Sequence, residues 1–147
     1  MGYVRKTIAL AGAAAGLAAV VQAPAQASVQ YADDQWGPIC SPGGCTSKAD
    51  GWIVWANRTA TVGGSVQDDI ANQQTTVYFD AFQGSVKVDS ETRTAKVSDT
   101  APVSFRFTIG NPDLPGGIDR IRIQICRTPV GGSEICDPVQ WNENRDF

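Results

Sequence analysis

Apolar and polar residues alternate along several short segments of this chain, a pattern typical of half-buried β-strands. In the segment 103–109 one face of the strand would carry only apolar side chains: Val103, Phe105, Phe107 and Ile109. The segment 120–125 alternates Arg or Gln with Ile in the same way. Each segment therefore predicts a strand with one face in a core and one face in solvent.

Further strands are expected wherever β-branched and aromatic residues cluster between turn residues. They are 52–56, 59–67 with a bulge or turn at its Gly-Gly pair, 75–82, 85–88, 92–97, and a last strand from 134 to about 141. Seven or eight short strands, with turns every eight to twelve residues, predict one all-β domain over 48–147, a single antiparallel immunoglobulin-like β-sandwich. A small closed barrel would show the same periodicity. The polar segment 67–74 is expected to form a surface loop or a helical turn.

The N-terminus has the three parts of a secretory signal peptide. Arg5 and Lys6 precede an Ala-rich apolar run over 7–21, and Ala25 and Ala27 supply the small-residue cleavage pattern. The apolar run is short for a membrane span, which needs about 20 strongly apolar residues. We therefore expect 1–27 to be removed, leaving a secreted, extracellular protein that is not held in a membrane.

The segment 28–47 shows neither strand nor helix periodicity, and it is expected to be an irregular, extended N-terminal arm. Tyr31, Trp36 and Pro38 are its candidate partner-binding residues, with Trp36 as an aromatic anchor for another protein, because such anchors carry much of the energy of an interface. In the alternative interpretation the arm packs on its own domain and Trp36 fills a site there.

Four cysteines follow the signal peptide: Cys40, Cys45, Cys126 and Cys136. An even number in an exported chain predicts disulfides, and the simplest of the three possible connectivities pairs Cys40 with Cys45 and Cys126 with Cys136. A zinc site built from all four cysteines is disfavoured by the spacings, four and nine intervening residues, and by export.

Charge limits the classes of partner. The full chain has a net charge of −3, and loss of the two basic residues of the signal leaves 10 basic against 15 acidic residues. Because phosphate contacts need clustered Lys and Arg, this balance disfavours nucleic acid.

Several kinds of catalytic site are excluded by composition. The chain has no histidine, and its cysteines are expected to be paired, so neither a His-dependent triad nor a thiol nucleophile is available. Three carboxylate pairs remain as a route to glycoside hydrolysis: Asp33/Asp34, Asp68/Asp69 and Asp89/Glu91. Asp68 and Asp69 are also a conceivable calcium site, although no EF-hand spacing is present. The sequence predicts no catalytic residue, no metal, no cofactor and no enzyme.

Three binding functions remain. The preferred one is an adaptor that joins other secreted proteins through its arm and an exposed sheet edge. The second is a carbohydrate or cell-wall binding module with sugar-stacking candidates Trp36, Trp52, Trp55, Tyr78 and Trp141, of which either Trp52 or Trp55 is expected in the core because they would face opposite ways. The third is a hydrolase inhibitor that presents a disulfide-framed loop, Ser41–Gly44 or Arg127–Ile135.

The overall plan resembles the small secreted adaptor subunit of bacterial umbrella-shaped toxin particles. The features that match are the Ala-rich signal, the irregular segment 31–38 before Cys40, and the single sandwich behind it. In that family an exported β-rich protein links a large toxin-bearing repeat protein to lectin-like subunits, and its extended N-terminal part threads the toxin protein. The resemblance implies a structural role in an antibacterial toxin complex.

Overall fold

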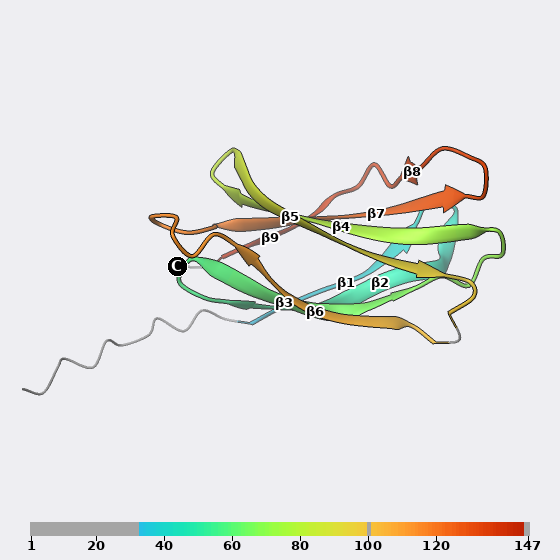
Figure 1. Ribbon diagram of the computed structural model, residues 1–147, viewed down its shortest axis with the longest axis horizontal. Coiled ribbons are helices and arrows are strands. Elements are labelled where there is room, and N and C mark those ends of the chain that lie inside the picture. The colour runs from blue at the N-terminus through green and yellow to red at the C-terminus, as the bar shows by residue number, and fades with distance from the viewer. Residues whose placement is uncertain (1–32, 100, 146–147) are drawn as a thin grey trace, which may run out of the picture.

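The chain forms two antiparallel sheets packed face to face (Figure 1). The computed structural model describes residues 33–99 and 101–145, so the expected signal peptide and Tyr31 lie outside the described residues. Within these residues there is no helix long and apolar enough to cross a membrane. The predicted all-β sandwich is confirmed.

The strands divide between the sheets in a Greek-key order. Sheet A has the order β1-β2-β3-β6 and consists of β1 (Asp34–Ser41), β2 (Gly44–Trp55), β3 (Thr59–Gln67) and β6 (Val103–Gly110). Sheet B has the order β5-β4-β7, with β8 and β9 both paired to β7, and consists of β4 (Gln73–Gln83), β5 (Val86–Lys96), β7 (Arg120–Pro129), β8 (Ile135–Cys136) and β9 (Trp141–Asn144). The pair β3–β6 corresponds to strands B and E of an immunoglobulin sandwich, and the pair β4–β7 corresponds to strands C and F.

The core lies between the sheets and has an aromatic centre. As the alternation predicts, the isoleucines of β7 and Ile109 of β6 are fully buried, and Val103, Phe105 and Phe107 pack against them. Phe79 of β4 contacts the rings of Phe105 and Phe107 across the interface, with centroids 5.5 and 5.1 Å apart. Rings at these distances add to the free energy gained from burial.

The expected irregular arm is wrong for the part of it that the structure describes. Residues 34–41 form β1, an edge strand that pairs antiparallel with β2. Trp36 is only 1% exposed and lies in the core, 5.5 Å from Phe79 and 6.3 Å from Phe105. Trp36 is therefore part of the sandwich and is not presented to a partner. This agrees with the alternative interpretation, in which Trp36 fills a site on its own domain. Pro38 is exposed at this edge.

Some predicted strand boundaries also change. The Gly63-Gly64 pair does not interrupt β3, which runs straight through it. The expected strands 85–88 and 92–97 are one strand, β5, and the expected last strand is divided into β8 and β9. The segment 68–72 is a loop, as predicted.

We expect Trp36→Ala to lower the free energy of unfolding by about 3–5 kcal/mol, since it removes a fully buried indole and leaves a cavity. A Trp36 side chain held out for a partner, as the arm interpretation expects, would instead be lost without cost to the fold. Urea unfolding measures the change. Trp141→Ala, at a site 40% exposed, is the matched control and should cost about 1 kcal/mol or less. Equal midpoints for the two variants would contradict the buried position of Trp36.

Candidate functional site

Four connections meet at one end of the sandwich, on the right in Figure 1. We call this the loop end, and it consists of the β1–β2 turn and the loops β3–β4, β5–β6 and β7–β8. Alternating strand direction brings them together: Ser41 pairs with Gly44, and Gln74 pairs with both Lys96 and Thr128. Loops fixed on a rigid sandwich are where such folds place binding residues.

Both disulfides stabilise the loop end. Cys40–Cys45 closes the β1–β2 turn, and Cys126–Cys136 joins β7 to β8 and frames the β7–β8 loop, so both predicted pairings are confirmed. The two disulfide-bonded connections are neighbours. A Cβ atom on Gly43 would lie 4.0 Å from the guanidinium carbon of Arg127. Two disulfides fit an oxidising extracellular environment.

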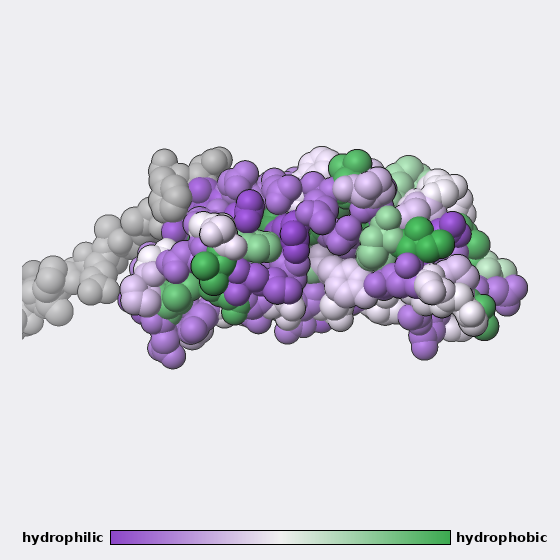
Figure 2. All heavy atoms as spheres, turned by 90° about the horizontal axis from the view of Figure 1, so that it is seen from above, coloured by the Kyte–Doolittle hydropathy of each residue, from purple (hydrophilic) through white to green (hydrophobic). Residues whose placement is uncertain are grey.

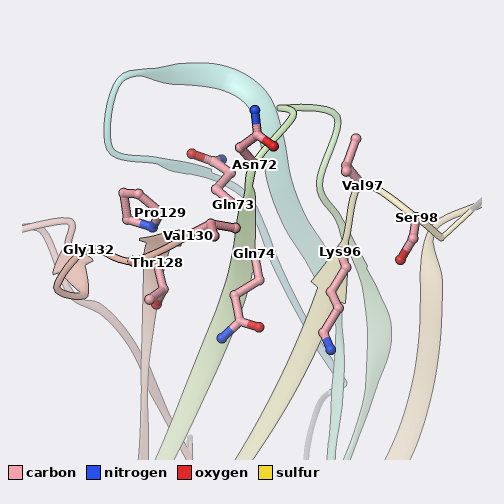
Figure 3. Close-up of a pocket in the computed structure, with 11 residues that line it drawn as sticks. Asn72, Gln73, Gln74, Lys96, Val97, Ser98, Thr128, Pro129, Val130 and Gly132 are labelled. Carbon is pink, nitrogen blue, oxygen red and sulfur yellow. The ribbon is translucent and has the colours of Figure 1, made fainter.

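A groove of about 520 Å³ opens between these loops on the outer side of sheet B (Figure 3). Its floor is formed by Gln74, Lys96 and Thr128, which are neighbours across three strands. Val97 and Val130 stand at its sides, 47% and 80% exposed. Apolar side chains this exposed, next to polar ones, are typical of a binding surface.

The polar floor of the groove has no internal partners. The side chains of Gln74, Lys96 and Thr128 form no hydrogen bond or ion pair with another described residue, although other polar side chains of sheet B do. These groups are therefore available to a bound molecule, and Lys96 contributes a positive charge.

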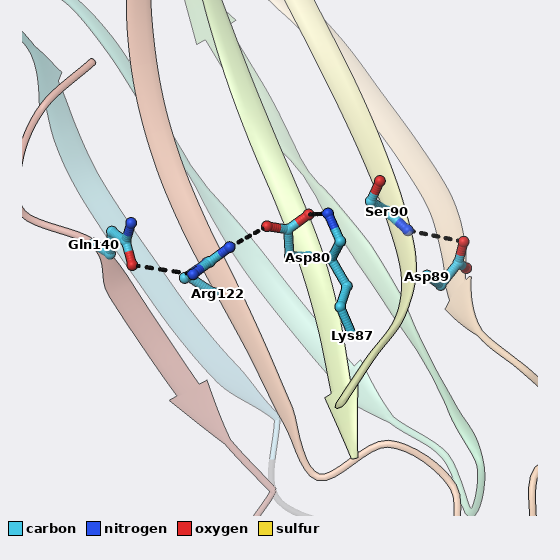
Figure 4. Close-up of polar contacts among 6 residues, drawn as sticks. All are labelled: Asp80, Lys87, Asp89, Ser90, Arg122 and Gln140. Atoms are coloured by element: carbon cyan, nitrogen blue, oxygen red, sulfur yellow. Dashed lines mark hydrogen bonds and ion pairs between the residues drawn. The ribbon is translucent and has the colours of Figure 1, made fainter. Parts of the chain in front are cut away.

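The middle of the same face is polar but already satisfied. In Figure 2 the middle is mainly hydrophilic, and hydrophobic residues appear towards both ends, including the right-hand end where the loops lie. Asp80 accepts from Arg122 at 2.5 Å and from Lys87 at 3.4 Å, and Gln140 lies 3.4 Å from Arg122 (Figure 4). Arg122 also covers the ring of Phe82, 5.0 Å from its centroid. This network braces the sheet.

The carboxylate pairs considered for glycoside hydrolysis are divided among structural contacts. Asp34 accepts from Trp55 Nε1 at 2.5 Å, and Glu91 pairs with Arg93 at 2.9 Å. Asp89 accepts from the backbone N–H of Gly110 at 2.8 Å. These contacts hold strands and loops in place.

Trp52 forms a second exposed feature, on the outer face of sheet A. The sequence expects one of Trp52 and Trp55 in the core; Trp55 is buried there and Trp52 is half-buried. The Trp52 indole lies against Gly63, where a Cβ would come within 2.2 Å of the ring, and the guanidinium of Arg106 is 5.6 Å from its centroid. Gly63 is thus explained by the close approach of the Trp52 ring, and Gly64 by that of the Asp50 carbonyl, rather than by a turn.

Clefts flank Trp52 on both sides. One, of about 470 Å³, is lined by polar residues that include Asp50 and Ser65. The other, of about 360 Å³, is lined by Asp33, Asp34 and Val54 among others. A partly exposed indole with polar groups and Val54 around it is an arrangement suited to contact with a sugar ring.

The sequence predictions locate the site only in part. Of the candidate partner-binding residues, Trp36 is in the core, Pro38 lies at the β1 edge away from the groove, and Tyr31 lies outside the described residues. The groove was missed because its floor is assembled from three strands. A signal did exist in Val130, an apolar residue in a Gly-rich turn between two cysteines.

Comparisons with known proteins found no matching family model, no similar curated protein and no similar solved structure.

Tyr78 offers a test of the geometry beside the groove. Its hydroxyl donates to Glu134 at 2.6 Å, and this hydrogen bond, with burial and the nearby negative charge, raises its pKa to about 12. Stability from this contact is therefore present below the ordinary pKa of 10.0 and is lost as pH rises towards 12. Ultraviolet titration of tyrosine should show a late-titrating group that moves back towards pH 10 in Glu134→Gln. An unchanged titration in that variant would contradict the contact.

Proposed function

We propose that this chain is a secreted, non-enzymatic protein-binding module that joins other extracellular proteins through its loop end. One observation carries the proposal: the groove combines exposed Val97 and Val130 with a polar floor that has no partner among the described residues. Disulfide-framed turns beside it reduce the entropy lost when the surface is fixed on a partner. The signal-like N-terminus and the two disulfides support export.

The loop end is a better candidate than the sheet edges for this contact. Pro38 has no backbone N–H, and the pairing of β1 shifts register across it and again between Cys40 and Ser41, so β1 offers little continuous edge to an added strand. At the opposite side of the sandwich the edge strands β5 and β6 cover each other, since Asp89 accepts from the N–H of Gly110 and Arg93 stacks 4.3 Å from Phe107. Strand addition would have to displace these contacts.

The resemblance to the adaptor of umbrella-shaped toxin particles extends this proposal. A single sandwich is common to both, but residues 34–41 form a strand here and not a free arm, so we assign the partner contact to the loop end. A role in an antibacterial toxin complex predicts a large secreted repeat protein as the partner.

A carbohydrate-binding module is the second candidate, and Trp52 is the observation that favours it. Its indole is fixed on Gly63, and the neighbouring clefts supply polar side chains such as Asp33 and Asp50 to a sugar that contacts it. Because this surface lies on sheet A and the groove on sheet B, variants can separate the two functions.

The protein-binding proposal predicts that Val130→Asp lowers partner capture by about tenfold or more, because a charge replaces an apolar contact at the groove. The matched control is Val86→Asp, which makes the same change at a site 63% exposed at the start of β5, at the other end of β4. To measure the effect, the tagged mature protein is purified from native culture supernatant, and the proteins that co-purify are quantified by mass spectrometry. Equal recovery of partner proteins by both variants, or recovery of the wild-type chain without any partner, would reject the proposal.

The carbohydrate alternative predicts a saturable change in tryptophan fluorescence when soluble cell-wall oligosaccharides are added at millimolar concentration. The change should disappear in Trp52→Ala and persist in Trp141→Ala, since the second indole lies at a different surface. A flat response from the wild-type protein across a panel of such oligosaccharides excludes this alternative.

A further inference from the structure

The groove at the loop end contains a single charged residue. Among the described residues that line it, Lys96 alone carries a charge, and the others are amides, hydroxyls, valines, a proline and glycines. The ammonium group of Lys96 forms no ion pair or hydrogen bond with another described residue. Its charge is uncompensated even though acidic residues outnumber basic ones in the chain.

The acidic residues of the neighbouring loops leave this charge unpaired. Asp99 Oδ2 accepts from the backbone N–H of Lys96 at 2.7 Å, but the Asp99 carboxylate forms no ion pair with the ammonium group. Asp69 and Glu134 each accept a hydrogen bond from a neighbouring side chain. None of these three acidic residues lines the groove. The groove is therefore suited to a molecule that carries a negative charge of its own.

Gln74 and Thr128 extend the floor of the groove in a row with Lys96 (Figure 3). Gln74 of β4 lies between the other two, because it pairs with Lys96 of β5 on one side and with Thr128 of β7 on the other. A glutamine side chain offers a carbonyl acceptor and N–H donors, the groups of a peptide bond, and a hydroxyl can donate or accept. Such a row suits the backbone of an extended peptide.

The apolar sides of the groove are fixed before a ligand binds. The backbone N–H of Val130 donates to the carbonyl of Asn72 at 2.8 Å, so the β7–β8 loop is held against the β3–β4 loop. Within the β7–β8 loop the N–H of Gly132 donates to the carbonyl of Pro129 at 3.0 Å. Val97 directly follows Lys96 at the end of β5. A preformed apolar surface loses little entropy on binding, and here it lies next to the positive charge.

We propose that the groove binds an extended, acidic segment of a partner protein. In this segment an Asp or Glu carboxylate meets Lys96, and an adjacent apolar side chain lies against Val97 and Val130. The inference rests on the proposed protein-binding function and specifies the partner. A neutral glycan would leave Lys96 unpaired, and an anionic polymer without apolar groups would leave both valines exposed. Because a single exposed ion pair contributes little, Lys96 selects the partner while the valines supply contact area.

Displayed peptides test this partner chemistry without the native partner. When random linear peptides on phage are selected against the mature protein, the enriched sequences should place Asp or Glu beside Val, Leu, Ile or Phe. A selected peptide is then synthesised with both termini blocked, and its affinity is measured by fluorescence polarisation at low salt. Replacing its acidic residue by the amide should weaken binding about threefold to tenfold. Enrichment of neutral or basic motifs, or of none, overturns the proposal. Binding that requires a free C-terminus would identify a terminal carboxylate and would overturn it as well.

Charge reversal identifies the residue that meets the acidic group. Lys96→Glu should weaken binding of the acidic peptide about tenfold or more, because two negative charges then face each other. The matched control is Lys48→Glu, which makes the same change in net charge at another exposed lysine, on β2 of sheet A. A peptide with Lys in place of its acidic residue should bind Lys96→Glu better than the wild-type protein. Equal affinities of the two variants for the acidic peptide would contradict the contact.

Val130→Asp separates failure of this inference from failure of the proposed function. Loss of native partner proteins with Val130→Asp but not with Lys96→Glu would mean that the loop end binds protein without an acidic segment, which overturns the inference and leaves the function standing. Full recovery of partners by both variants would reject both. Loss with both variants, together with acid-dependent peptide binding, is the result expected.

Discussion

The insertion of Trp36 between the sheets is the contact on which the rest of the structure depends. Its indole, from an edge strand of sheet A, meets Phe79 of sheet B and Phe105 on the opposite edge of its own sheet. Gly51 is needed beneath it, because a Cβ there would come within 2.7 Å of the indole. With β1 held in this way, the turn that follows it reaches β7 at the loop end, where Gly43 approaches Arg127. One buried ring thus helps to place a binding surface at the far end of its strand.

The sequence predicted those elements of the fold that a local pattern of residues determines. It did not predict elements that depend on partners distant in the sequence. Strands β6 and β7 were predictable because alternation alone identifies their buried faces. Strand β1 was not, since Gly37 and Pro38 interrupt its pattern and only pairing with β2 makes it a strand. For the same reason Trp36 looked like a free anchor, and Gly63 looked like a turn until the Trp52 ring was found against it. The sequence favoured both disulfide pairs as the simplest of three connectivities, whereas the groove required strand order.

The sheet edges show what kind of partner contact the fold permits. An open edge invites pairing with any extended chain, and proteins block it with proline, irregular pairing or charged side chains. Here β1 has Pro38 and two register shifts, and Asp89 and Arg93 join β5 to β6. These edges therefore offer little to an added strand, which is why we assign recognition to the side chains of the loop end.

Hydrogen-bond satisfaction distinguishes the parts of the surface that support the fold from those that await a ligand. On sheet B the Asp80–Arg122 network is complete within the chain, so a ligand would have to break existing contacts to use it. A few residues along the same strands, Gln74, Lys96 and Thr128 have no such contacts to lose. Asp68 presents the same distinction inside the fold, with one oxygen saturated and the other without a partner among the described residues. Because unmet polar groups cost more as they become more buried, the unpartnered Oδ2 of Asp68 costs the fold more than the solvent-accessible groups of the groove do.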